Sequence, residues 1–132
     1  MPQYMLDTDI CIRVIKARPE RLSQKFERHS GHLCISSIVL AELLFGAEKS
    51  RQRLASLETV ANFVARLDVL RFTEEAAAHY GEIRAHLENA GAPIGPYDML
   101  IAAHARSEAL VMITGNEREF GRVPGLRVEN WL

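Results

Sequence analysis

The sequence is poor in cysteine and has no long apolar run. Only two of its 132 residues are cysteines, Cys11 and Cys34, and both lie in short apolar stretches. Two isolated cysteines form neither a disulfide framework nor a zinc site, so we interpret them as buried thiols in a reducing compartment. No apolar run approaches the roughly 20 residues that span a bilayer, and the N-terminus lacks a basic segment followed by an apolar one. These absences predict a cytoplasmic protein without a membrane partner.

An excess of charge of one sign is also missing. Sixteen Lys and Arg residues stand against 17 Asp and Glu residues, which leaves a formal net charge of -1. A polycationic nucleic-acid coat is therefore excluded. Hydrophobic residues make up 48% of the chain and charged residues 25%, close to the globular average, so wholesale disorder is excluded too. A chain of 132 residues has the length of one domain, and we predict a single domain over residues 1–132.

Short apolar runs alternate with segments of helical periodicity. Strands are predicted at 4–6, 32–35, 69–72, 110–113 and 126–128, and helices at 10–14, 19–28, 37–47, 51–67, 74–89, 99–106 and 117–120. In the helix 51–67 the predicted apolar stripe consists of Leu54, Leu57, Val60, Ala61, Val64 and Leu67. This alternation predicts an α/β fold with a parallel sheet, helices on both faces and the last strand at an edge.

Acidic residues follow several of these strands. Asp7 and Asp9 come after the first strand, Glu42 lies on the helix after the second, and Asp98 opens the helix before the strand 110–113. Glu117 and Glu119 follow that strand. Ligands of parallel α/β sheets bind at the carboxyl ends of the strands, where these acids can converge. Crowded carboxylates resist ionisation unless a cation lies between them, and oxygen ligands without His or Cys suit Mg²⁺ or Mn²⁺. We expect the helix dipole to hold Asp98 ionised.

Each acid alone also has an ordinary structural interpretation. Asp7 or Asp9 can cap the helix that follows, and Glu119 can form a surface ion pair with Arg122. Glu42 is flanked by apolar residues and therefore needs a partner. The histidines show no metal-ligand spacing, and we interpret them as structural or surface residues.

Taken in order, the motifs resemble a known family. They are MLDTD (5–9), ISSIVLAEL (35–43) with Gly46 and Ala47, GPYDMLIAAHA (95–105), TGNEREF (114–120) and VPGLRVENW (123–131). Together they are similar to the PIN-domain ribonuclease toxins of VapC type, over essentially the whole chain. The resemblance implies a three-layer α/β/α sandwich around a short, mostly parallel sheet. It also implies Mg²⁺- or Mn²⁺-dependent endonucleolytic hydrolysis of RNA, with Asp7, Glu42 and Asp98 as the metal-binding acids.

The same resemblance implies partners. It suggests a toxin homodimer, inhibited by a VapB-type antitoxin whose tail enters the active-site groove, in a complex that binds operator DNA. The subgroup with these motifs resembles toxins that cleave tRNA in the anticodon loop, the initiator tRNA in particular. Basic residues at 13–28, Arg18 among them, and at 49–53 are candidates for contacts with RNA phosphates.

One position departs from the family pattern. Many PIN domains have an acid two residues after the Thr that ends the fourth strand, and here that residue is Asn116. We expect Glu119, one turn further on, to serve as the fourth catalytic acid. Thr114 is expected to hydrogen-bond a carboxylate or the attacking water. Arg118 can neutralise phosphate or pair with the acids.

Two other functions compete with a nuclease. The sequence Asp7-Thr8-Asp9 mimics the nucleophile motif of haloacid-dehalogenase phosphatases, but no adjacent pair of Asp residues occurs near residue 114. A receiver-like signalling domain requires a phosphorylated Asp after a central strand and a Lys after a late strand, and neither is visible. A catalytically dead binding module is a third possibility, which the three intact acids argue against.

Overall fold

A computed structural model describes residues 1–16 and 19–132 and contains one five-stranded sheet, ordered β3-β2-β1-β4-β5. The strands are β1 (Tyr4–Leu6), β2 (Leu33–Ser36), β3 (Asp68–Leu70), β4 (Val111–Ile113) and β5 (Val128–Glu129). Every neighbouring pair is parallel, and Met5 of β1 lies between Cys34 and Met112. The parallel sheet and the edge position of the last strand were both predicted, and both are confirmed.

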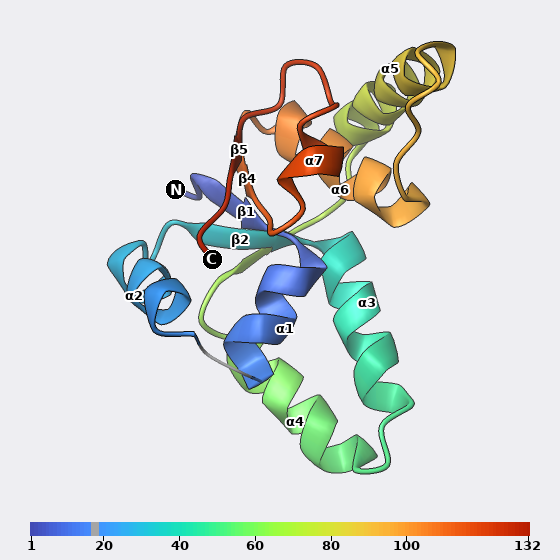
Figure 1. Cartoon of the computed structure of the whole chain (residues 1–132). Coiled ribbons are helices and arrows are strands. Elements are labelled where there is room, and N and C mark those ends of the chain that lie inside the picture. Colours follow the sequence, from blue (N-terminus) through green and yellow to red (C-terminus); the bar gives the residue numbers. More distant parts are fainter. Residues whose placement is uncertain (17–18) are drawn as a thin grey trace.

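Helices cover the two faces of this sheet. They are α1 (Thr8–Lys16), α2 (Glu20–Arg28), α3 (Ser37–Glu48), α4 (Arg53–Val64), α5 (Glu74–Asn89), α6 (Pro96–Ser107) and α7 (Glu117–Phe120). Helices α1 to α4 gather on one side of the strands, and α5 to α7 lie on the other (Figure 1). Right-handed connections require this division, because the chain first moves from β1 towards β3 and then crosses back to β4. The predicted α/β/α layers are confirmed.

The reversal of direction produces a switch point between β1 and β4. The chain leaves β1 towards one edge of the sheet and leaves β4 towards the other. The connections after two such strands diverge, so their carboxyl ends face an open crevice. Asp7 directly follows β1 and Thr114 directly follows β4. This crevice is the first place to look for a site.

The strands and the inward helix faces form the core. All of β2 is buried, and Trp131 near the C-terminus is only 1% exposed. Cys11 and Cys34 are buried and unpaired, as predicted, and burial raises the pKa of Cys34 to about 12. His104 is also buried and bonds Ser36 Oγ at 2.8 Å through Nδ1, which agrees with a structural interpretation.

Several predicted details were wrong. The stripe on α4 does not include Leu54, which is 75% exposed, or Ala61, because the buried positions are Val60 and Phe63. Helix α6 begins at Pro96 rather than after Asp98, since proline is well accommodated in the first turn of a helix. The basic residue Arg18 lies outside the described residues. No helix in the described ranges is long and apolar enough to cross a membrane.

Candidate active site

Asp7 lies at the carboxyl end of the central strand and has two structural partners. Its Oδ1 accepts a hydrogen bond of 2.8 Å from the backbone N–H of Ile10, so it caps α1. Its Oδ2 accepts the hydroxyl proton of Thr114, which follows β4. The capping interpretation and the site interpretation of Asp7 are therefore compatible. The two bonds hold a buried carboxylate, only 5% exposed, in one orientation at the switch point.

Burial dominates the protonation of Asp7. It raises the pKa of Asp7 to about 6, even though the bonds from Thr114 and Ile10 act in the opposite direction. The nearby charges of Asp9 and Asp98 raise this pKa further. A carboxylate with a raised pKa is ionised more easily when a cation lies beside it. Asp7 therefore has the electrostatic environment of a cation ligand.

Asp98 reaches the same crevice from the first turn of α6. The preceding Gly95 allows a close approach, because a Cβ atom there would lie 3.3 Å from Asp98 Oδ2. The pKa of Asp98 is raised to about 6. Burial is the largest cause, and the charges of Glu119, Glu42 and Asp9 act in the same direction. This upward shift is opposite in direction to the effect expected from the helix N-terminus, although a carboxyl with a pKa of about 6 is still mostly ionised at neutral pH.

Glu42 has a hydrogen-bond partner, as its apolar sequence neighbours led us to expect. It lies on α3, one to two turns from the N-terminus, and is half-buried. Its Oε1 accepts a hydrogen bond of 2.6 Å from the hydroxyl of Thr8, the first residue of α1. Sequence reasoning did not identify Thr8 as part of the site. The only signal was its position between two acids, which does not reveal contact with a residue 34 positions away.

The segment after β4 is organised around Thr114 and Asn116. Thr114 Oγ1 accepts the backbone N–H of Asn116 at 2.9 Å while it donates to Asp7. Asn116 caps the short helix α7, and its Nδ2 donates to Glu119 Oε2 at 3.0 Å. The predicted contact of Thr114 with a carboxylate is thus present. Glu119 pairs with Asn116, whereas Arg122 donates to the carbonyl of Pro93 at 3.0 Å.

These acids border one cavity of about 300 Å³. Its lining consists of Asp7, Thr8, Asp9, Glu42, Asp98, Asn116 and Phe120. Glu119 lies outside this lining. Among the neighbouring acids, however, its charge makes the largest contribution to the raised pKa of Asp98. A second, mostly apolar groove of about 500 Å³ between α1, α3 and α4 shares Glu42 with the first cavity. Glu42 therefore lies where the two hollows adjoin.

The oxygen atoms that line the cavity suit a hard cation that keeps part of its water shell. Carboxylate, hydroxyl and amide oxygens line the cavity, with no His or Cys ligand. Among residues 1–16 and 19–132, no three His, Cys, Asp or Glu side chains are close enough to form a ready-made metal cage. Mg²⁺ does not require a cage, because it keeps several waters and binds through one or two carboxylates and substrate phosphates. The residues present thus fit Mg²⁺ or Mn²⁺.

Three residues outside the cavity lining have other surroundings. Glu117 accepts a hydrogen bond of 3.1 Å from Asn130 Nδ2, on the C-terminal segment. Arg118 is exposed on α7 and does not line the cavity. Tyr97, expected in a loop, lies in the first turn of α6 and is 60% exposed.

The chain matches known proteins over its full length. The PIN domain family matches residues 4–126. The chain is 49% identical over 131 residues to the tRNA(fMet)-specific endonuclease VapC of Salmonella typhimurium, with 99% of each chain covered. It is 47% identical over 132 residues to Ribonuclease VapC2 of Haemophilus influenzae, with 100% of each chain covered. The chain belongs to the VapC ribonucleases of the PIN-domain family.

The fold agrees with this assignment. This VapC-family protein matches the crystal structure of DNA-bound VapBC from Salmonella typhimurium with a TM-score of 0.97 and 48% identity, covering 100% of both chains. The resemblance inferred from the motifs is confirmed, and so is the PIN fold. The phosphatase and receiver alternatives are excluded, because neither is compatible with full-length membership of this family.

Proposed function

We propose that this protein is a metal-dependent endoribonuclease whose metal-binding acids are Asp7, Glu42 and Asp98. The observation that supports this most directly is the cavity at the switch point, where carboxylates from α3, α6 and the end of β1 meet. The raised pKa values of Asp7 and Asp98 add support, because crowded acids favour a bound cation. The family membership supplies the ribonuclease activity, and the oxygen-only lining favours Mg²⁺ or Mn²⁺.

In this proposal Asp7 is held more firmly than the other two acids. Asp7 is the rigid member, since both of its oxygens are hydrogen-bonded within the protein. Asp98 on α6 and Glu42 on α3 line the same cavity as Asp7, so the three side chains border one space. A divalent cation there would polarise a phosphoryl oxygen and lower the pKa of water, which makes a nucleophile at neutral pH.

Glu119 is proposed as the fourth catalytic acid. Asn116 keeps its carboxylate near the cavity, and the charge of Glu119 acts on Asp98. Asn116 itself lines the cavity and offers an amide oxygen, but it brings no charge. Thr114 supports Asp7, and we propose that exposed Arg118 contacts RNA phosphate beyond the cavity.

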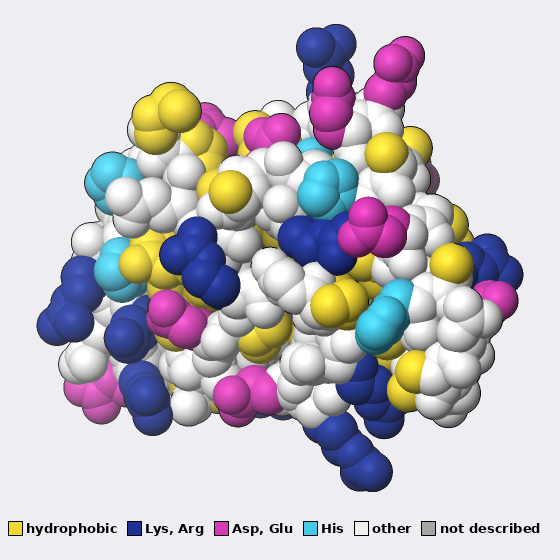
Figure 2. All heavy atoms as spheres, turned by 90° about the horizontal axis from the view of Figure 1, so that it is seen from above, with side chains coloured by type: hydrophobic (Ala, Val, Ile, Leu, Met, Phe, Trp, Pro, Cys, Tyr) yellow, Lys and Arg dark blue, Asp and Glu magenta, His cyan; other side chains and the backbone are white. Residues whose placement is uncertain are grey.

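We infer that the substrate is tRNA, with the anticodon loop of initiator tRNA as the cleaved region. The 49%-identical Salmonella relative is a tRNA(fMet)-specific endonuclease. A small open site suits a short single-stranded loop, whose backbone can bend into it. Lys and Arg side chains are interspersed with Asp and Glu on the face shown in Figure 2. We therefore place the phosphate contacts nearer the site, where Lys16 and Lys49 line the adjoining groove.

We further propose a VapB-type antitoxin as the inhibitor of this protein. The Salmonella structure with the same fold is a VapBC complex bound to DNA. The groove between α1, α3 and α4 is mostly apolar and reaches Glu42, so an antitoxin segment in it would extend to the acids. We expect a homodimer within such a complex on operator DNA, with each copy a single domain over 1–132. With tRNA as its substrate, we propose that the protein acts in the cytoplasm.

The decisive experiment is cleavage of purified tRNA by the purified protein, with the cleaved ends mapped. Cleavage in the anticodon loop of initiator tRNA is expected with Mg²⁺ or Mn²⁺ and not with EDTA. Asp7→Asn is the matched control, because Asn still caps α1 but lacks the charge. Full activity in EDTA, or an active and folded Asp7→Asn variant, would contradict the proposed metal site. Cleavage of other RNA alone would contradict the substrate assignment.

A further inference from the structure

Thr8 makes a contact that its position in a helix does not require. As the first residue of α1, it could point its hydroxyl to solvent or to a local backbone group. Instead Thr8 Oγ1 donates a 2.6 Å hydrogen bond to Glu42 Oε1, 34 residues away on α3. Both side chains border the cavity that also contains Asp7 and Asp98.

We propose that Thr8 is the positioning residue for Glu42, which it holds in the orientation that the metal site requires. Glutamate is long and loses considerable rotamer freedom when it is held in one place. A carboxylate has about four acceptor sites, so a single hydroxyl orients Glu42 and leaves most of them free for a cation. Thr8 is well suited to this role because its neighbour Asp7 caps the same helix and fixes the backbone there.

Two of the three acids are then oriented by a threonine. Thr114 orients Asp7, and Thr8 orients Glu42, in each case through a hydroxyl group. Partners that orient metal ligands typically change metal affinity or activity by roughly 10- to 100-fold when removed. The inference rests on the proposed function, because it assumes that Glu42 is a metal ligand. It differs from a simple link between α1 and α3, which would affect folding stability alone.

The test is direct Mn²⁺ binding, measured by calorimetry or electron paramagnetic resonance without RNA. Thr8→Val removes the hydroxyl while keeping the side-chain shape, and we expect roughly 10- to 100-fold weaker Mn²⁺ binding. Thr8→Ser keeps the hydroxyl and should retain affinity within about threefold. Thr59→Val is the matched control, because Thr59 bonds only the backbone of its own helix at Ala55 and is exposed. Thr8→Ala provides a second hydroxyl-free variant.

A double-mutant cycle with Glu42→Gln identifies the residue through which Thr8 acts. In the Glu42→Gln background, Thr8→Val should cause less than about a twofold further loss of Mn²⁺ affinity. Wild-type Mn²⁺ affinity in both Thr8→Val and Thr8→Ala would overturn the proposal. An undiminished effect of Thr8→Val in the Glu42→Gln background would overturn it too. If the wild-type protein fails to bind Mn²⁺, or Asp7→Asn binds it equally well, the proposed metal site itself is wrong.

Discussion

Asp7 shows how one residue combines a structural and a chemical role. Its carboxylate caps α1 and accepts a hydrogen bond from the hydroxyl of Thr114, so it is held without any cation. Burial nevertheless raises its pKa to about 6. The two hydrogen bonds therefore orient the carboxylate of Asp7, whereas its burial disfavours the ionised form.

Asp98 should be a destabilising residue in the metal-free protein. Its pKa rises from 3.8 to about 6 on folding, so the folded state binds a proton more tightly than the unfolded state. Stability is then lost as the pH rises from about 4 to about 6, and the full cost remains above that range. We expect Asp98→Asn to raise the free energy of unfolding at pH 7.5 by about 1 kcal/mol, since solvent screens a half-buried group.

Urea denaturation in EDTA at several pH values measures this effect. The gain from Asp98→Asn should shrink as the pH falls through 6 towards 4, because the wild-type carboxyl of the folded state then becomes protonated and loses its unfavourable charge. Ser107→Ala, at the far end of the same helix, is a control for a general effect of substitution on α6. A gain that does not depend on pH would contradict the electrostatic explanation.

Glu119 should matter for the metal site despite lying outside the cavity lining. Glu119→Gln removes the charge that acts on Asp98 and keeps the shape of the side chain. We expect weaker Mn²⁺ binding and roughly 10-fold slower cleavage, as for loss of a group that supports metal ligands. Metal titrations of activity and of binding measure both quantities. Glu117→Gln is the matched control, because Glu117 bonds Asn130 instead, and wild-type behaviour of Glu119→Gln would make the fourth acid dispensable.

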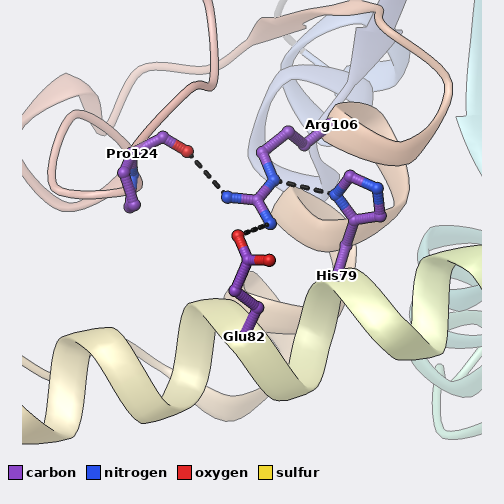
Figure 3. Close-up of polar contacts among 4 residues, drawn as sticks. All are labelled: His79, Glu82, Arg106 and Pro124. Carbon is purple, nitrogen blue, oxygen red and sulfur yellow. Dashed lines mark hydrogen bonds and ion pairs between the residues drawn. The ribbon is translucent and has the colours of Figure 1, made fainter.

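At the scale of elements, one arginine connects two helices and the C-terminal loop. Arg106 on α6 donates to His79 Nδ1 at 2.8 Å and to Glu82 Oε1 at 2.7 Å, both on α5, and to the carbonyl of Pro124 at 2.9 Å (Figure 3). Its side chain is 12% exposed, whereas that of Glu82 is 73% exposed. A mostly buried guanidinium with three partners differs from an ordinary surface ion pair.

Loss of this arginine should therefore destabilise the protein. We expect Arg106→Leu to lower the free energy of unfolding by about 2–3 kcal/mol, because three polar groups lose a charged donor. Urea denaturation is the measurement. Arg84→Leu is the control, since the solvent-exposed pair of Arg84 with Glu88 should contribute little to stability. Equal effects of the two substitutions would contradict the connecting role of Arg106.

The boundaries of α6 and the face of α4 illustrate what local pattern misses. Gly-Pro-Tyr before Asp98 has the composition of a loop, but Pro96 is the first helical residue and Asp98 lies in the first turn. Helix α4 carries apolar residues on more than one face, and packing selects Val60 and Phe63 for burial. The stop of α5 was predicted well, because Gly91 adopts φ +66°, which glycine tolerates without strain.

At the scale of the whole molecule, the metal should stabilise the fold. The cavity contains Asp7 and Asp98, whose pKa values are raised by burial and by neighbouring acids, and a cation relieves both costs. We expect Mg²⁺ or Mn²⁺ to raise the unfolding temperature, with a gain of about 3 kcal/mol at a hundredfold excess over the dissociation constant.

Thermal unfolding with and without metal tests this expectation. The increase should be larger at pH 7.5 than at pH 5, because protons compete with the cation for Asp7 and Asp98 below about pH 6. Asp7→Asn serves as the control and should lose most of the increase. An equal increase in wild type and Asp7→Asn would mean that the cation stabilises the protein elsewhere.

The sequence by itself determined the fold class and the main acids. Apolar runs alternating with helical periodicity imply a parallel sheet, and its geometry brings residues after successive strands to one edge. Asp7, Glu42 and Asp98 could therefore be selected without coordinates, and all three border one cavity. The motif order led to the family, which the full-length matches confirm.

Only the tertiary structure decided how those acids are held and charged. Hydrogen bonds between residues far apart in the chain, such as Thr8 with Glu42 and Thr114 with Asp7, leave no local pattern. The protonation of Asp98 depends on burial and on charges from other elements, which sequence reasoning from the helix N-terminus alone did not include. Local patterns specify which residues lie at a strand end, whereas packing across the switch point sets their distances, partners and pKa values.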